Sequence, residues 1–149
     1  MYKFIGISAL VLIGYFLFIR EASPEIIYFN GQEYGSRQLD RSNDSNSKIY
    51  NYYSKVVSNK DYISIVYPDS DTGSLSDWSN LFSKHFESQG FIFSANGENK
   101  TGIKNTVKVF MRPSQRHNVV FMYILENIQS SDHIDEDNIF TQLDAIVLE

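Results

Sequence analysis

The sequence predicts an α+β protein: a single N-terminal transmembrane helix followed by a small two-layer α/β sandwich with a mostly antiparallel sheet. Residues 2–19 form one apolar run. The later part of the chain switches between helical and strand periodicities, in the order α-β-α-β-β-β-α. That part is long enough for one domain with its own core. We therefore divide the chain into a transmembrane signal-anchor helix (1–20), a linker (21–44) and an extracytoplasmic α+β domain (45–149).

The apolar run predicts the first helix. No charged residue lies between Lys3 and Arg20, and a helix over residues 2–19 would be roughly 27 Å long, close to the roughly 30 Å hydrocarbon core of a bilayer. A cleaved signal peptide is the alternative, but Arg20 and Glu21 stand where its cleavage site needs small residues. A pilin leader is disfavoured because Pro24 would break the long helix early. An uncleaved, single-pass anchor is the expectation.

Charge predicts the orientation and the partners. Lys3 and the terminal amine place the N-terminus in the cytoplasm, and the domain in the periplasm or outside the cell. The chain carries a formal charge of −5, and Lys3 and Arg20 are the only charged side chains before residue 21. Residues 21–149 therefore carry a formal charge of −7, which disfavours nucleic acid as a partner. The bilayer and envelope proteins are the expected partners. The chain has no cysteine, so no disulfide framework is expected.

The predicted linker is rich in Ser, Asn, Gly and charge, with one short strand over residues 26–29 before the turn at Asn30 and Gly31. The domain opens with a helix, because its apolar residues recur at helical spacing: Ile49, Tyr52, Tyr53, Val56 and Val57. Residues 62–67 are β-branched and aromatic and end at Pro68, which predicts a strand.

A second helix follows, capped by Ser74 or Ser76 and closed by Gly90. One face of it is apolar and carries Trp78, Leu81, Phe82, His85 and Phe86. Residues 91–94 are the next strand, and 96–102 are a loop. Residues 106–111 and 119–125 form an antiparallel hairpin, with Lys108 and Arg112 on one solvated strand face. The last helix presents Ile139, Phe140, Leu143, Ile146 and Val147 on one stripe. If the strands on either side of the second helix are parallel, that unit is a right-handed crossover.

The one dense carboxylate patch is the only candidate metal site. Asp132, Asp135 and Asp137 supply the oxygen ligands that hard cations prefer. The glycine turn and terminal Glu of an EF-hand loop are missing, so capping of the last helix is the favoured interpretation. We therefore predict no metal and no cofactor.

No catalytic set is predicted. His85 lies on an apolar helix face and His117 in a hairpin loop, where we expect a partly buried and an exposed side chain. The tripeptide Asp71-Thr72-Gly73 matches the aspartic-protease motif, but occurs once, and those enzymes need two such carboxylates. We interpret it as a turn before a helix cap. No serine of the chain lies in the Gly-x-Ser-x-Gly elbow that would mark it as a nucleophile.

The absent catalytic set, acidic domain and single anchor favour a docking or assembly module in a cell-envelope complex, not an enzyme. Two alternatives stay open. One is a membrane-tethered hydrolase or metal-dependent enzyme that uses the acidic patch Asp132–Asp137. The other is a solute-binding or sensor domain. A cleft with convergent polar residues would favour the enzyme, and a flat apolar patch with tyrosines at its rim would favour docking.

Overall fold

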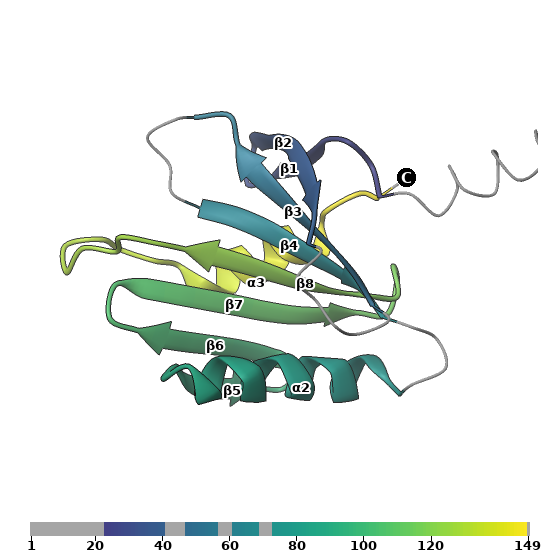
Figure 1. Ribbon diagram of the computed structural model, residues 1–149. Helices are drawn as coiled ribbons and strands as arrows, with labels where there is room; N and C mark the ends of the chain where they lie inside the picture. Colours follow the sequence, from purple (N-terminus) through teal and green to yellow (C-terminus); the bar gives the residue numbers. More distant parts are fainter. Residues whose placement is uncertain (1–22, 41–46, 57–60, 69–72, 149) are drawn as a thin grey trace, which may run out of the picture.

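The computed structural model describes residues 23–40, 47–56, 61–68 and 73–148 (Figure 1). These residues form one sheet of eight strands and two helices. The strands are β1 (Ile27–Phe29), β2 (Gln32–Leu39), β3 (Lys48–Ser54), β4 (Asp61–Tyr67), β5 (Ile92–Asn96), β6 (Asn99–Lys104), β7 (Val107–Ser114) and β8 (Val119–Leu125). The helices are α2 (Leu75–Ser88) and α3 (Glu136–Asp144).

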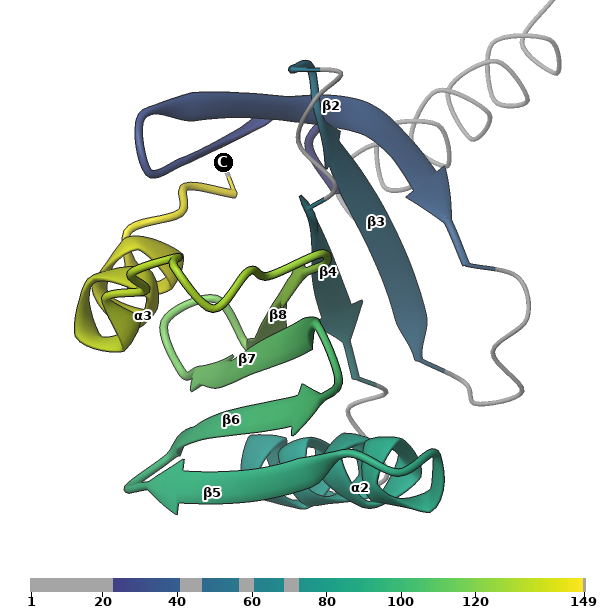
Figure 2. The same ribbon diagram turned by 90° about the vertical axis from the view of Figure 1, so that its left-hand side faces the viewer.

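Every strand pair in the sheet is antiparallel, in the spatial order β1-β2-β3-β4-β8-β7-β6-β5. The two halves of the chain meet where β4 pairs with β8, so β1 and β5 are the two edges. Figure 2 shows that the sheet bends, with β1 and β2 reaching over the side that carries α3. A register shift between Gly35 and Gln38 lies on β2, and such irregularities increase the local bend of a strand.

The helices cover opposite faces of the sheet (Figures 1 and 2). Side chains along a strand alternate between the two faces, and here both faces are apolar at the centre. The α3 face buries Tyr52, Ile63, Ile65, Phe110 and Phe121. The α2 face buries Val66, Val109, Met111, Val120 and Met122. Burial on both faces explains why β8 is a continuous apolar run from Val119 to Leu125.

The predicted two-layer sandwich is wrong. The described architecture has three layers, with a helix on each face of an entirely antiparallel sheet. The helix predicted at Ile49–Val57 is strand β3 as far as Ser54, because its tyrosines are shared between the two faces of the sheet. Two strands, β1 and β2, lie within the predicted linker.

The predicted loop over residues 96–102 is also wrong, since a two-residue turn at Gly97 and Glu98 joins β5 to β6. Gly97 has φ +62°, which a turn of this kind requires. The predicted crossover does not occur either. Strand β4 lies at the centre of the sheet and β5 at its edge, so the strands on either side of α2 are not neighbours.

The prediction of a single-pass transmembrane helix finds no support in the structure and is corrected here. Neither α2 nor α3 is long and apolar enough to cross a membrane. The segment at residues 2–19 on which the prediction was based lies outside the described residues.

Candidate functional site

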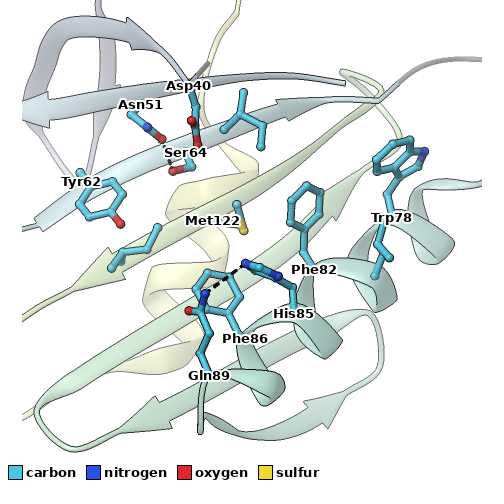
Figure 3. A pocket seen from close by; sticks show the side chains of 13 residues that line it. Asp40, Asn51, Tyr62, Ser64, Trp78, Phe82, His85, Phe86, Gln89 and Met122 are labelled. Carbon is cyan, nitrogen blue, oxygen red and sulfur yellow. Dashed lines mark hydrogen bonds between the residues drawn. The ribbon is translucent and has the colours of Figure 1, made fainter. Parts of the chain in front are cut away.

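A cavity of about 530 Å³ lies between α2 and the sheet. On this face of the sheet, helix α2 covers β7 and β8. The cavity lies beside the helix, where β3 and β4 continue the sheet (Figure 3). Side chains from β3, β4, β8 and α2 line it, together with one residue after β2 and the C-cap of α2: Asp40, Ile49, Asn51, Tyr62, Ser64, Trp78, Leu81, Phe82, His85, Phe86, Gln89, Met122 and Ile124.

Cross-strand pairing builds the floor of the cavity. Asn51 pairs with Ser64, and Ser64 pairs with Met122, so these residues form one row across β3, β4 and β8. The row continues to Met111 on β7, directly beneath the helix. The row is therefore polar where α2 is absent and apolar where α2 covers it.

Helix α2 builds the opposite wall. Ser74 caps its first turn, and the Asp77 side chain accepts a hydrogen bond from the Ser74 backbone N–H, which completes a capping box. At the other end Gly90 has φ +99°, and the N–H of Phe91 donates to the carbonyl of Phe86 at 3.1 Å. This is a Schellman closure. Of the two predicted caps, Ser74 and Ser76, the structure uses Ser74, and the predicted stop at Gly90 is confirmed.

Ring contacts hold the aromatic wall in place. Trp78 stacks on Phe82 with ring centroids 6.2 Å apart, and Phe86 meets Phe91 edge-on at 5.2 Å. All three of these α2 rings line the cavity: Trp78 is buried, and Phe82 and Phe86 are half-buried. The rings make this part of the helix side apolar, and each phenylalanine is held by a neighbouring aromatic ring.

The polar lining residues are oriented by hydrogen bonds. The hydroxyl of Ser64 donates to Oδ1 of Asn51 at 2.5 Å, and Nε2 of His85 lies 3.2 Å from Nε2 of Gln89. The backbone N–H of Asp40 donates to the Ile49 carbonyl at 2.8 Å, which holds Asp40 beside β3. Burial raises the pKa of Tyr62, and the negative charges of Glu126 and Asp40 raise it further.

This arrangement is suited to binding. A nucleophile needs a base within hydrogen-bond reach, but the Ser64 hydroxyl donates to Asn51 and the His85 ring contacts Gln89. The cavity also has a size typical of ligand sites, which measure roughly 300–1,000 Å³. Apolar walls with a few placed polar groups are the usual composition of such sites.

A second polar cluster lies on the α3 face, and sequence patterns gave no sign of it. The Asp61 carboxylate is buried, and its Oδ2 accepts hydrogen bonds from the hydroxyls of Tyr34 at 2.5 Å and Tyr123 at 2.7 Å. Burial, and then the hydrogen bond to Asp61, raises the pKa of both tyrosines well above its usual range. Oδ1 of Asp61 is buried without a partner among the described residues. The cluster ties β2, β4 and β8 together.

The predicted carboxylate patch is located at the start of α3. Asp135 is the N-cap and accepts from the N–H of Asn138 at 3.1 Å, and Asp137 lies in the first turn. Asp132 accepts from the N–H of Gln129 at 2.7 Å. Each thus serves a local backbone contact or faces the helix terminus. Among the described residues, no group of three His, Cys, Asp or Glu side chains is placed to hold a metal ion.

The histidines are separated. His85 is exposed rather than partly buried, although it has a hydrogen-bond partner as expected. His117 is half-buried against Phe121, which corrects the expected exposure, and His133 is exposed. The Asp-Thr-Gly tripeptide begins outside the described residues, and only its Gly73 is seen.

Lys108 and Arg112 do share a strand face, but that face is not simply solvated. Lys108 pairs with Glu136 at 3.4 Å and Arg112 with Asp144 at 3.3 Å, so both bind acids of α3.

Sequence reasoning found the α2 half of the cavity as an apolar helix face but missed the strand half. Asp40 fell in the predicted linker and Asn51 in a predicted helix. Strict alternation along β4, where Tyr62 and Ser64 share one face and Ile63 and Ile65 the other, was the available signal. The chain matches no family model, no curated protein sequence and no solved structure.

Proposed function

We propose that this protein is a non-catalytic binding domain whose site is the cavity between α2 and the sheet. The observation that carries the proposal is the cavity of about 530 Å³, which has aromatic rings on its helix side and polar groups on its strand side among apolar residues. Its ligand is a small amphipathic solute: the apolar part packs on Phe82 and Phe86, and the polar part reaches Asn51 and Ser64. This proposal takes up the solute-binding alternative that the sequence left open and names a site for it.

The site contains its own reporter, because Trp78 is the only tryptophan in the chain and lines the cavity. We expect a screen of small aromatic alcohols, amines and acids to include compounds that change Trp78 emission saturably. Asn51→Phe should remove that response, because the added ring occupies the floor of the cavity.

Lys48→Phe is the matched control, since it adds the same ring to the same strand at an exposed position that does not line the cavity. It should bind as the wild type does. Circular dichroism should show that both variants fold. Unchanged binding in a folded Asn51→Phe variant would place the ligand elsewhere and refute the proposal.

The docking or assembly role is the second candidate function, and the edge strand β5 favours it. Strand β5 has no charged residue, and Ile92 on it is 75% exposed. Edge strands that stay apart usually carry charges, proline or a bulge. Two copies could pair their β5 edges antiparallel without bringing like charges together. The predicted extracytoplasmic location depends on residues outside the described part and stays a prediction.

Sedimentation velocity over a wide concentration range tests this second function. A dimer that Ile92→Lys abolishes and Ile103→Lys preserves would support pairing through β5, because Ile103 is also exposed but lies on the inner strand β6. A wild-type chain that stays monomeric throughout would exclude pairing of two copies through this edge.

A further inference from the structure

The floor of the cavity contains two neutral polar side chains that share one hydrogen bond. The hydroxyl of Ser64 donates its only proton to Oδ1 of Asn51 at 2.5 Å. A hydroxyl has one donor and two lone pairs, and a carboxamide nitrogen has two donors. Ser64 is therefore left as an acceptor. Nδ2 of Asn51 keeps its donors, because no further hydrogen bond of this side chain occurs among the described residues. A donor and an acceptor thus lie side by side on the strand side of the cavity.

The sheet fixes the position of this pair. Asn51 and Ser64 are cross-strand partners on β3 and β4, and both line the cavity (Figure 3). Ser64 is 4% exposed and Asn51 is half-buried. A buried polar group costs free energy when it has no partner. The remaining donor and acceptor therefore favour a ligand that offers the opposite pair on neighbouring atoms.

The helix side adds a second neutral pair. An amide nitrogen can only donate, so Nε2 of His85 is the acceptor in its 3.2 Å contact with Nε2 of Gln89. The side-chain carbonyl of Gln89 is then left as an acceptor in the cavity lining. Asp40 also lines the cavity, but it has interactions of its own, including the hydrogen bond from its N–H to Ile49, and we assign the ligand no contact with it. Uncharged groups thus lie on both sides of the cavity.

A carboxamide group matches the pair on the strand side. Its carbonyl oxygen accepts and its N–H donates, and both atoms are bonded to the same carbon. One planar group therefore accepts from Nδ2 of Asn51 and donates to Oγ of Ser64, provided that its N–H and C=O point to the same side. Primary amides and lactams have this geometry. An ester or a ketone offers only the acceptor, and an ammonium group offers only donors.

We infer that the cavity recognises a carboxamide, primary or cyclic, carried on an apolar body of about one aromatic ring. The inference rests on the proposed binding function and names the class of its ligand. The amide binds Asn51 and Ser64. The apolar body packs against the half-buried rings of Phe82 and Phe86 on the helix side.

Three probes of equal size separate the two hydrogen bonds: 3-phenylpropanamide, 4-phenyl-2-butanone and 3-phenylpropionate. The ketone keeps the carbonyl acceptor but has a methyl group in place of the amide nitrogen. Each probe is titrated into the full chain while Trp78 emission is followed. We expect the amide to bind about three- to tenfold more tightly than the ketone or the acid, because one hydrogen bond contributes about that factor.

Ser64→Ala removes the acceptor and leaves Asn51 in place. This variant should lose about three- to tenfold in affinity for the amide and keep its affinity for the ketone, which has no proton to give to Ser64. Asn51→Asp replaces the donor by an oxygen, so the amide and the ketone should both bind more weakly. Ser94→Ala is the matched control, because Ser94 is exposed on β5 and does not line the cavity. It should leave all three affinities unchanged.

The outcomes separate this inference from the function it rests on. If the ketone or the acid binds as tightly as the amide, the cavity binds solutes but does not select a carboxamide. The same conclusion holds if Ser64→Ala, shown to be folded by circular dichroism, weakens the amide and the ketone equally. If no probe and no screened compound changes Trp78 emission, the proposed binding function fails together with the inference.

Discussion

Tyr52 shows how strongly the surroundings of one hydroxyl change its chemistry. Its side chain is fully buried, and its hydroxyl donates to the Pro24 carbonyl at 2.5 Å and contacts the Ser23 hydroxyl. Burial raises the pKa of Tyr52 to about 12. Since the phenolate is disfavoured inside the protein, folding favours the protonated form.

This raised pKa predicts a loss of stability in alkali. The folded pKa lies above the unfolded value near 10, so the contribution is fully present below about pH 10 and is lost as the pH rises through 12. We expect the free energy of unfolding to fall by about 2–3 kcal/mol over that range from this residue. Tyr34 and Tyr123, whose pKa values are also raised, act in the same direction.

Urea unfolding at several pH values between about 8 and 12 measures the effect. Tyr52→Phe should be less stable than the wild type at neutral pH, because the variant loses its hydrogen bonds, yet should decline less steeply in alkali. Tyr28→Phe is the control, since Tyr28 is exposed. Parallel pH curves for the wild type and Tyr52→Phe would show that this hydroxyl does not titrate as described.

Gly102 gives a second residue-scale prediction. It lies directly opposite Phe93, and a Cβ atom on it would come within 2.4–2.8 Å of three atoms of the Phe93 ring. The ring thus covers the glycine. Gly102→Ala should cost about 1–3 kcal/mol because the ring must move.

A double-mutant cycle checks the cause of that cost. In a Phe93→Leu background the same Gly102→Ala change should cost clearly less, while Ser94→Ala, an exposed change on β5, should have little effect in either background. Equal costs for Gly102→Ala in both backgrounds would show that the ring is not what excludes the methyl group.

At the scale of elements, helix α2 both fills the core and lines the cavity, and its apolar pattern alone does not show which residue does which. Trp78 is buried in the core, whereas Phe82 and Phe86 are half-buried and leave part of each ring facing the cavity. The pattern predicts that these residues share a face, and the structure confirms it.

This difference in depth lowers the expected cost of truncating Phe86. We expect Phe86→Ala to reduce the free energy of unfolding by about 2 kcal/mol, below the roughly 3–5 kcal/mol typical of a fully buried phenylalanine. Denaturant melts followed by circular dichroism measure it. Leu81→Ala, at a position 56% exposed on the same helix, should cost much less. A loss above about 4 kcal/mol for Phe86→Ala would mean that its ring is a full core residue.

Strand β3 is the element that the sequence pattern misrepresents. Ile49, Tyr52 and Tyr53 have helical spacing, but in the sheet Tyr52 points to the α3 face while Ile49 points to the α2 face. A strand buried on both sides loses the simple alternation from which strands are recognised. Its identity follows from pairing with β2 and β4, which are distant contacts.

For the whole molecule, the single sheet joins the two cores. The α2 core and the α3 core lie on opposite faces of the same central strands β4, β7 and β8. Loss of either core removes the support of the strands that the other core needs. The described part of the chain should therefore unfold as one cooperative unit.

A mutation in one core should be detected by a probe in the other core. Leu143 of α3 is fully buried, on the face of the sheet opposite to Trp78. Leu143→Ala should cost about 2–5 kcal/mol and should lower the midpoint of the urea transition seen by Trp78 emission as much as the midpoint seen by circular dichroism. Separate midpoints, with the Trp78 transition unmoved, would show that the two cores unfold independently.

Local patterns determined those elements that need only their own residues. The Ser74 cap, the apolar stripe of α2 and the Gly90 stop are set within one helix, and β4, β7 and β8 follow from β-branched and aromatic runs. The same reading found that the Asp132–Asp137 patch lies at the start of a helix. These features are governed by contacts between residues a few positions apart, which a sequence displays directly.

The tertiary structure alone decided the layer arrangement and the site. The sheet order depends on β4 meeting β8, a pairing of residues about sixty positions apart, and this pairing sends α2 and α3 to opposite faces. Asp40, Asn51 and Ser64 become one polar wall only because β3 and β4 extend past α2. The sequence contains each of these side chains, but their convergence is a property of strand register, which long-range packing sets.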